Sequence, residues 1–118
     1  MRYICLVHFE GAHLDSMPEP ERSEFNRRSA AYDKELEAKG HYIIAEAIQG
    51  GDSAVLVRVR DGQVSTTDGP YIETKEQMAG FILIEARDLN EAVRLASGIP
   101  LAELGTIEVR PIYVIPGQ

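Results

Sequence analysis

The hydrophobic residues of this chain recur with two different spacings, and the order in which the two spacings follow one another leaves few folds open. Apolar runs that are continuous or alternate at every second residue predict strands, whereas apolar residues three and four apart predict helices. The predicted order is strand, helix, strand, hairpin, strand, helix and strand. The corresponding ranges are 2–9, 19–39, 42–48, 55–67, 81–84, 88–97 and 106–115.

The first predicted helix has a mainly apolar stripe and a clear end. The stripe consists of Phe25, Ser29, Tyr32 and Leu36, which lie on one side of a helix. Charged residues, Asp33 among them, are expected to project away from this stripe. Gly40 is expected to end the helix, because glycine readily adopts the left-handed conformation that follows many helices.

Local signals define the other elements. Asp88 and Glu91 have the spacing of a capping box, which predicts the start of the second helix. Asp61-Gly62 between two β-rich runs predicts a tight hairpin, and the valines at alternate positions of its first strand predict a half-buried strand. Segment 11–20 is expected to be a loop, and segment 68–78 a loop or a short helical turn. Pro111 suits an edge strand, because proline has no N–H for a ladder hydrogen bond.

Without the inserted hairpin, the order is β-α-β-β-α-β, which predicts a single α+β domain over residues 1–118 with a ferredoxin-like fold. In such a fold both helices cover the same face of an antiparallel sheet. Because the strands are strongly apolar, we expect the other face to be covered by a second copy of the chain. The sequence therefore predicts a homodimer.

Composition excludes several classes of function. Twelve Lys and Arg residues against nineteen Asp and Glu residues give a net charge of −7, which argues against binding to nucleic acid or to anionic membranes. No apolar run is long enough to span a bilayer, and we expect a cytoplasmic protein. The lone Cys5 permits no intrachain disulfide and reads as a core residue. No metal site is expected, because no Cys/His cluster has zinc spacing, and no cofactor is expected.

The densest group of polar residues lies in segment 68–76. Asp68, Glu73 and Glu76 supply three carboxylates and Lys75 an amine, a set that could perform acid/base chemistry. The alternative is that Asp68 caps a turn and that the rest is a solvated loop. Spacing alone favours the alternative, because aspartate is common in turns.

This segment also resembles a known family. The run Asp68-Gly69-Pro70-Tyr71, followed by residues 73–77 and by Gly80-Phe81, resembles the signature of the DGPF subgroup of the YCII-related family. The subgroup usually has Phe where this chain has Tyr71. The likeness extends over essentially the whole chain, and it implies a dimeric, α+β-barrel-like fold of ferredoxin-like units. It implies no particular activity, although the genes of this subgroup often lie near those of extracytoplasmic-function sigma factors.

One feature of the wider family is absent. Members proposed to be enzymes use a His–Asp pair whose histidine lies on the first helix. This chain has no histidine between Asp15 and Lys39, so that pair cannot be carried over. Any acid/base groups must come from elsewhere in the chain.

The remaining histidines and one arginine are the other candidates. His41 follows the end of the first helix, where it could act as a proton carrier or could simply interact with the last helix carbonyls. His8 reads as a hydrogen-bonded imidazole in the first strand, and His13 as an exposed loop residue. Arg110 could bind a carboxylate-bearing ligand, or could pair with Glu108 on the same face of the last strand.

Two hypotheses of different classes follow. In the first, the chain is a dimeric protein that binds a small organic molecule in a pocket between sheet and helices bordered by segment 68–76. In that pocket Asp68, Glu73 and His41 would be the catalytic acid/base groups, and Lys75 and Arg110 would contact substrate. In the second, the chain is a non-catalytic regulatory or interaction module, for example a sigma-factor partner, and segment 68–76 only stabilises the fold.

Overall fold

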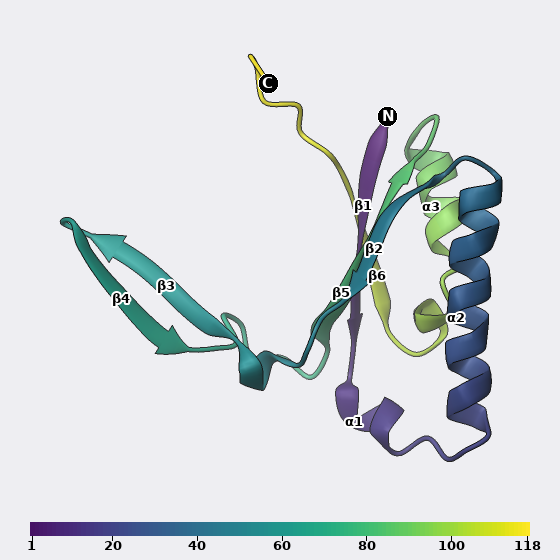
Figure 1. Ribbon diagram of the computed structural model, residues 1–118, viewed down its shortest axis with the longest axis horizontal. Coiled ribbons are helices and arrows are strands. Elements are labelled where there is room, and N and C mark those ends of the chain that lie inside the picture. The colour runs from purple at the N-terminus through teal and green to yellow at the C-terminus, as the bar shows by residue number, and fades with distance from the viewer.

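The computed structural model describes residues 1–118 as an antiparallel four-stranded sheet with helices on one face (Figure 1). The strands lie in the order β2-β5-β1-β6, and their bounds are β1 Arg2–Phe9, β2 Tyr42–Ala47, β5 Gln77–Glu85 and β6 Thr106–Pro111. The two main helices are α2 Glu21–Ala38 and α3 Leu89–Ala96. This order and these connections confirm the predicted α+β, ferredoxin-like fold.

The shorter elements connect this framework. One-turn helix α1 spans Gly11–Asp15, and two 3-10 turns, η1 and η2, span Gly51–Ser53 and Pro100–Glu103. The hairpin between β2 and β5 consists of β3 Val55–Arg60 and β4 Gln63–Asp68, and it forms a separate two-stranded sheet. Its turn residues Asp61 and Gly62 have φ values of 52° and 74°, as an Asp-Gly hairpin turn requires.

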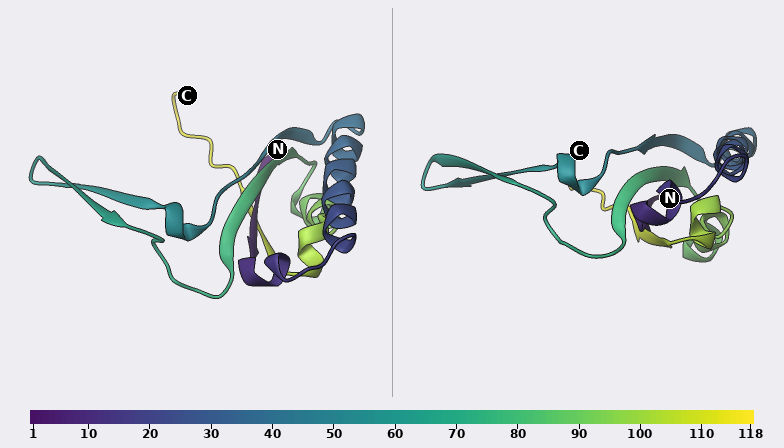
Figure 2. Two further views of the ribbon diagram at one scale, coloured as in Figure 1. Left: turned by 60° about the horizontal axis from the view of Figure 1, so that its bottom comes forward. Right: turned by 90° about the horizontal axis from the view of Figure 1, so that it is seen from below.

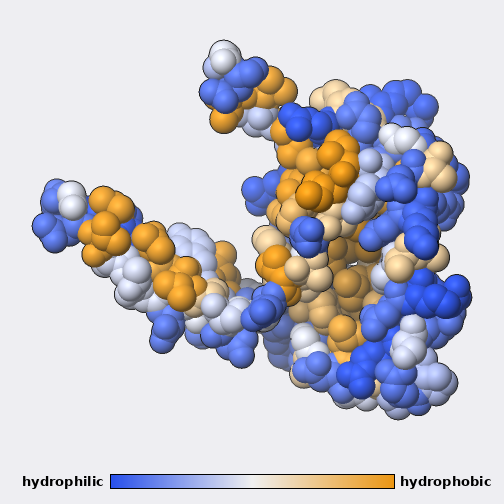
Figure 3. Space-filling view, viewed as in Figure 1, coloured by the Kyte–Doolittle hydropathy of each residue, from blue (hydrophilic) through white to orange (hydrophobic).

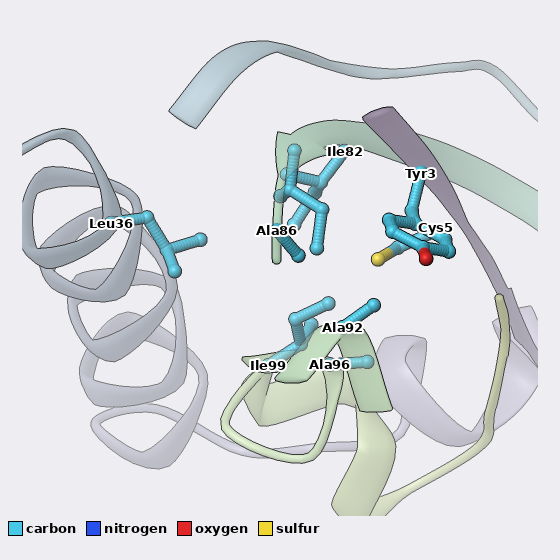
Figure 4. Close-up of a cluster of buried hydrophobic side chains, with 9 residues drawn as sticks. Tyr3, Cys5, Leu36, Ile82, Ala86, Ala92, Ala96 and Ile99 are labelled. Atoms are coloured by element: carbon cyan, nitrogen blue, oxygen red, sulfur yellow. The ribbon is translucent and has the colours of Figure 1, made fainter. Parts of the chain in front are cut away.

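The core lies between the sheet and the helices. Tyr3, Cys5 and Ile82 project from the central strands toward α2 and α3, where they meet Leu36 and Ala92 (Figure 4). The register explains this grouping, because Tyr3 lies opposite Ile84 and Cys5 opposite Ile82, and residues directly opposite in a ladder share a face. Burial raises the pKa of the Cys5 thiol to about 11, which suits a core residue and not a nucleophile.

The opposite face of the sheet is apolar and has no cover within the chain. Ile4 and Leu6 alternate with the buried residues of β1, and their partners in β5 are Leu83 and Phe81. These four side chains are half-buried, because no helix packs over them. We call this surface the far face.

Helix α3 begins at the predicted cap. The carboxylate of Asp88 accepts a hydrogen bond of 2.9 Å from the N–H of Glu91. Glu91 reaches back to the N–H of Arg87 at 2.8 Å, one residue before the position of a standard capping box. That hydrogen bond, together with the nearby cations Arg87 and Arg94, lowers the pKa of the buried Glu91 carboxyl.

Five details differ from the prediction. Part of the predicted loop 11–20 forms α1, which is one turn of helix. The turn-forming residues Ser16 and Pro18 come only after that turn. Strand β5 begins at Gln77, four residues early, and Asp68 lies in β4 instead of in a loop. Strand β6 ends at Pro111, four residues earlier than predicted, and the N–H of Ile112 makes a last hydrogen bond of 2.9 Å to the carbonyl of Arg2. The valines of β3 are exposed instead of half-buried, since nothing in the chain packs on them.

The Asp88 cap gives the first prediction. Asp88→Ala should lower the free energy of unfolding by about 1 kcal/mol and the melting temperature by about 4 °C, because the N–H of Glu91 loses its acceptor. Asp88→Ser, which retains an acceptor, is the control. Urea unfolding of both variants measures the difference, and equal losses in the two would contradict a capping role.

Candidate functional site

The Asp-Gly-Pro segment is built into the base of the hairpin. Asp68 is the last residue of β4 and lies opposite Val55. The N–H of Gly69 donates to the carbonyl of Ala54 at 2.8 Å, and a Cβ at position 69 would lie 2.6 Å from the Cβ of Ala54. A larger residue would not fit there, so close packing explains why this position of the motif is a glycine.

The rest of the segment is held by hydrogen bonds, and most of it points to solvent. Glu76 is the exception among its carboxylates, since it is half-buried and accepts a hydrogen bond of 2.8 Å from the hydroxyl of Thr106. The side chain of Gln77 donates to the carbonyls of Ile72 and Thr74, at 3.1 and 2.7 Å. Glu73 and Lys75 are exposed. The alternative weighed from the sequence, a solvated loop, therefore describes these two side chains well.

The structure does not bring the three predicted acid/base groups together. His41 lies beside the last residue of β5, where its Nδ1 is 2.8 Å from the carbonyl oxygen of Glu85. Segment 68–76 precedes the first residue of β5, so the whole length of that strand separates His41 from Asp68 and Glu73. The ring of His41 contacts a strand carbonyl, and only its backbone N–H bonds to helix α2, at the carbonyl of Leu36.

Arg110 and His8 share one carboxylate. Glu108 accepts a hydrogen bond of 2.8 Å from Nε of Arg110, and its other oxygen is 3.0 Å from Nε2 of His8. Arg110 and then His8 lower the pKa of the Glu108 carboxyl. Arg110 is thus paired within the chain, as one of the two interpretations of the sequence expected.

A wide hollow of about 660 Å³ lies next to His8, at the base of the hairpin. Leu56 and Met78 form part of its walls, and Tyr71 and Ile72, both strongly exposed, lie at its rim. Segment 68–76 borders this hollow and not the space between sheet and helices. Its walls include the base of a hairpin that projects away from the body.

A second recess lies between α2 and the sheet, with a volume of about 220 Å³ (Figure 3). Small residues of the sheet, Ala45, Ala47 and Gly80, line part of this recess. Gly80 has a close-packing reason of its own, since a Cβ there would lie 2.6 Å from the carbonyl oxygen of Glu46. We call this recess the α2 cleft.

Asp33 brings an ionisable group into the α2 cleft. It lines the recess together with Ser29 and Tyr32, which lie one turn earlier and one residue earlier on α2. Burial is the one cause that raises the pKa of its carboxyl. The sequence-based expectation that Asp33 projects away from the packed face of α2 is therefore wrong. The spacing of four residues from Ser29 is the signal that could have revealed it.

The α2 cleft has the features of a small-molecule site. Nine of its fourteen lining residues are hydrophobic, and its few polar groups come from one face of α2 and from Glu46 of β2. The hydroxyl of Tyr32 already donates to the carbonyl of Leu95, so it fixes the wall of the cleft. A carboxyl whose pKa is raised by burial in an apolar recess is a candidate for exchanging a proton with a ligand.

The structure also bears on whether the chain has a metal site or a helix that could span a membrane. No three His, Cys, Asp or Glu side chains are grouped so that they could hold a metal ion. None of the helices combines the length and the apolar character needed to cross a membrane.

Comparisons with known proteins add one relative in sequence and one solved structure of similar fold. A protein of Rhizobium meliloti (strain 1021) named "Uncharacterized protein R00369" is 39% identical over 69 residues. The match covers 56% of this chain and 56% of that protein, so it spans about half of the relative's length.

A solved structure shows the same fold. It is 5-chloro-2-hydroxyhydroquinone dehydrochlorinase from Burkholderia phenoliruptrix AC1100 in complex with 2,5-dihydroxybenzoquinone, with a TM-score of 0.58 and 15% identity over 96% of this chain and 94% of that chain. At this identity the likeness concerns the fold alone. The model of the YCII-related domain matches residues 1–116, nearly the whole chain, and the protein therefore belongs to the YCII-related family.

Proposed function

We propose that this protein binds a small, single-ring organic molecule in the α2 cleft and uses Asp33 to exchange a proton with it. The observation that carries the proposal is the Asp33 carboxyl, whose pKa is raised by burial in a mostly apolar recess. A cavity of about 150 Å³ can already hold benzene, so the 220 Å³ of the cleft suits one ring with small substituents.

The proposed chemistry is acid/base chemistry without a covalent intermediate. An ionised Asp33 would accept a proton from a ring hydroxyl, and the neutral acid would return it to another position of the ring. The apolar floor keeps the carboxyl partly desolvated, which brings its pKa closer to the pH at which it works. The fold shared with a dehydrochlorinase that was solved with a dihydroxybenzoquinone supports a ring of this class.

The α2 cleft is preferred to the wider hollow because of its walls. Helix α2, turn η2 and the sheet belong to one packed body, and their mutual positions are set by the core. The hollow beside His8 depends on the hairpin base and on exposed rim residues. A ligand site needs a preformed shape, because ordering mobile walls on binding costs free energy.

We also propose the finer assignment to the DGPF subgroup, supported by Asp68-Gly69-Pro70-Tyr71 and the residues that follow it. In this chain the motif packs the hairpin base, through the contact of Gly69 with Ala54. The proposed homodimer is supported by the uncovered far face. The second candidate function, an interaction module with a regulatory partner, is favoured by one observation, the exposed valines of the hairpin.

A thermal-shift screen tests the proposed ligand class. Single-ring phenols and hydroxyquinones, with 2,5-dihydroxybenzoquinone among them, should include a compound that stabilises the protein by about 2.7 kcal/mol at one hundred times its dissociation constant. Ser29→Trp should abolish that stabilisation, because the indole fills the cleft. Ala30→Trp, exposed on the same helix and outside the cleft, should retain it. If no compound stabilises the wild type, or if both variants respond alike, the proposal is wrong.

Asp33 should also impose a pH dependence on stability. Its folded pKa is raised above the ordinary value of 3.8, so the folded state holds more protons than the unfolded state between the two values. The contribution of Asp33 to stability is therefore fully present below pH 3.8 and is lost as pH rises through its folded pKa. Asp33→Asn should be more stable than the wild type at pH 7, and the difference should vanish toward acid pH.

Denaturant unfolding across this pH range measures the effect. Glu37→Gln, at an exposed position of the same helix, is the matched control and should change the slope of stability with pH far less. A variant Asp33→Asn that is less stable than the wild type at pH 7 would mean that the carboxylate is stabilised in the fold. That result would remove the basis for its raised pKa.

A further inference from the structure

The hairpin β3–β4 has no packing partner in its own chain. Its two strands pair with each other and with no other strand, and they project from the body (Figure 2). A lone two-stranded hairpin is at best marginally stable in water, because it cannot bury an apolar face. Something outside the chain must therefore hold it in place.

One face of the hairpin is made of valines. Val55, Val57 and Val59 point the same way from β3, and Val64 of β4 lies opposite Val59. Between 56% and 69% of each of these four residues is exposed. The space-filling view shows apolar atoms along the arm and at the C-terminal segment (Figure 3). We call these four residues the valine face.

The exposed surface of the chain is larger than that of a compact monomer of the same mass. The chain exposes 8256 Å², whereas a folded monomer of 13.1 kDa exposes about 6,400 Å². The excess is about 1,900 Å² per chain, so two chains would bury on the order of 3,700 Å², which lies in the range of obligate dimers. The radius of gyration, 16.5 Å against about 13.5 Å for a compact chain of this length, indicates the same extension.

We propose that the hairpin is an arm whose valine face packs on a second copy of this chain, so that the two copies exchange arms. The inference rests on the homodimer proposed above and does not depend on Asp33. In a two-fold dimer the arm of each copy meets an apolar surface on the other copy, because each copy also has an uncovered far face.

Charge also favours a second copy as the occupant. Residues 55–68 contain two arginines and two aspartates, so the arm is neutral while the rest of the chain carries the net charge of −7. A neutral arm can approach an acidic copy without repulsion. The acidic body disfavours the other obvious apolar occupant, an anionic membrane surface.

Substitutions on the two faces of the arm test the proposal by sedimentation velocity over a concentration series. Val57→Lys should raise the dimer dissociation constant by about 100-fold or more, because two symmetry-related contacts each lose an apolar anchor and gain a charge. Thr67→Lys, on the opposite face of the hairpin, should leave the constant unchanged. Val57→Thr keeps the shape and the strand preference, so its expected increase of about 10-fold cannot come from misfolding.

Each result supports or overturns a defined statement. A wild type that is monomeric at micromolar concentration overturns both the arm and the homodimer. If Leu6→Lys on the far face separates the dimer while Val57→Lys leaves its dissociation constant unchanged, the homodimer stands and the arm is wrong. If Ser29→Trp loses ligand binding while its dimer dissociation constant stays unchanged, the result supports the ligand site in the α2 cleft and its independence from the arm.

Discussion

The alternation of side chains along four strongly apolar strands governs this molecule. Placing Tyr3 and Cys5 of β1 under the helices necessarily turns Ile4 and Leu6 outward, because successive residues of a strand point to opposite faces. The two helices cover one face only. The same register that builds the core therefore creates the far face, and the chain is left with more exposed surface than a folded monomer of its mass.

The cleft arises within the same framework. Small residues, Ala45, Ala47 and Gly80, occupy the helix-facing positions of β2 and β5 where α2 passes, so sheet and helix enclose space instead of side chains. A carboxyl placed there loses part of its hydration, and its pKa rises as a result. The site thus depends on differences in side-chain size along the strands, while the fold depends on the periodicity of the apolar residues.

Periodicity was sufficient to predict the fold, and it was insufficient for the site. The helices, the Asp61-Gly62 turn and the Asp88 cap are local features, and the structure confirms them. The expected grouping of Asp68 with His41 does not occur, because β2 and β5 are antiparallel. His41, before β2, lies beside the end of β5, whereas Asp68 precedes the start of β5. Asp33 was missed because a charged residue is normally expected to face water. Small residues across the cleft leave room for its carboxyl on the packed side of α2.

Hydrogen exchange of the amides of β3 and β4 tests most directly whether the folded unit contains two copies. If arms are exchanged, the amides of residues 55–60 and 63–68 are protected, and their protection increases with protein concentration together with that of β1. A lone hairpin opens freely whatever the concentration. Fast exchange of these amides at every concentration, beside a protected β1, would contradict the account.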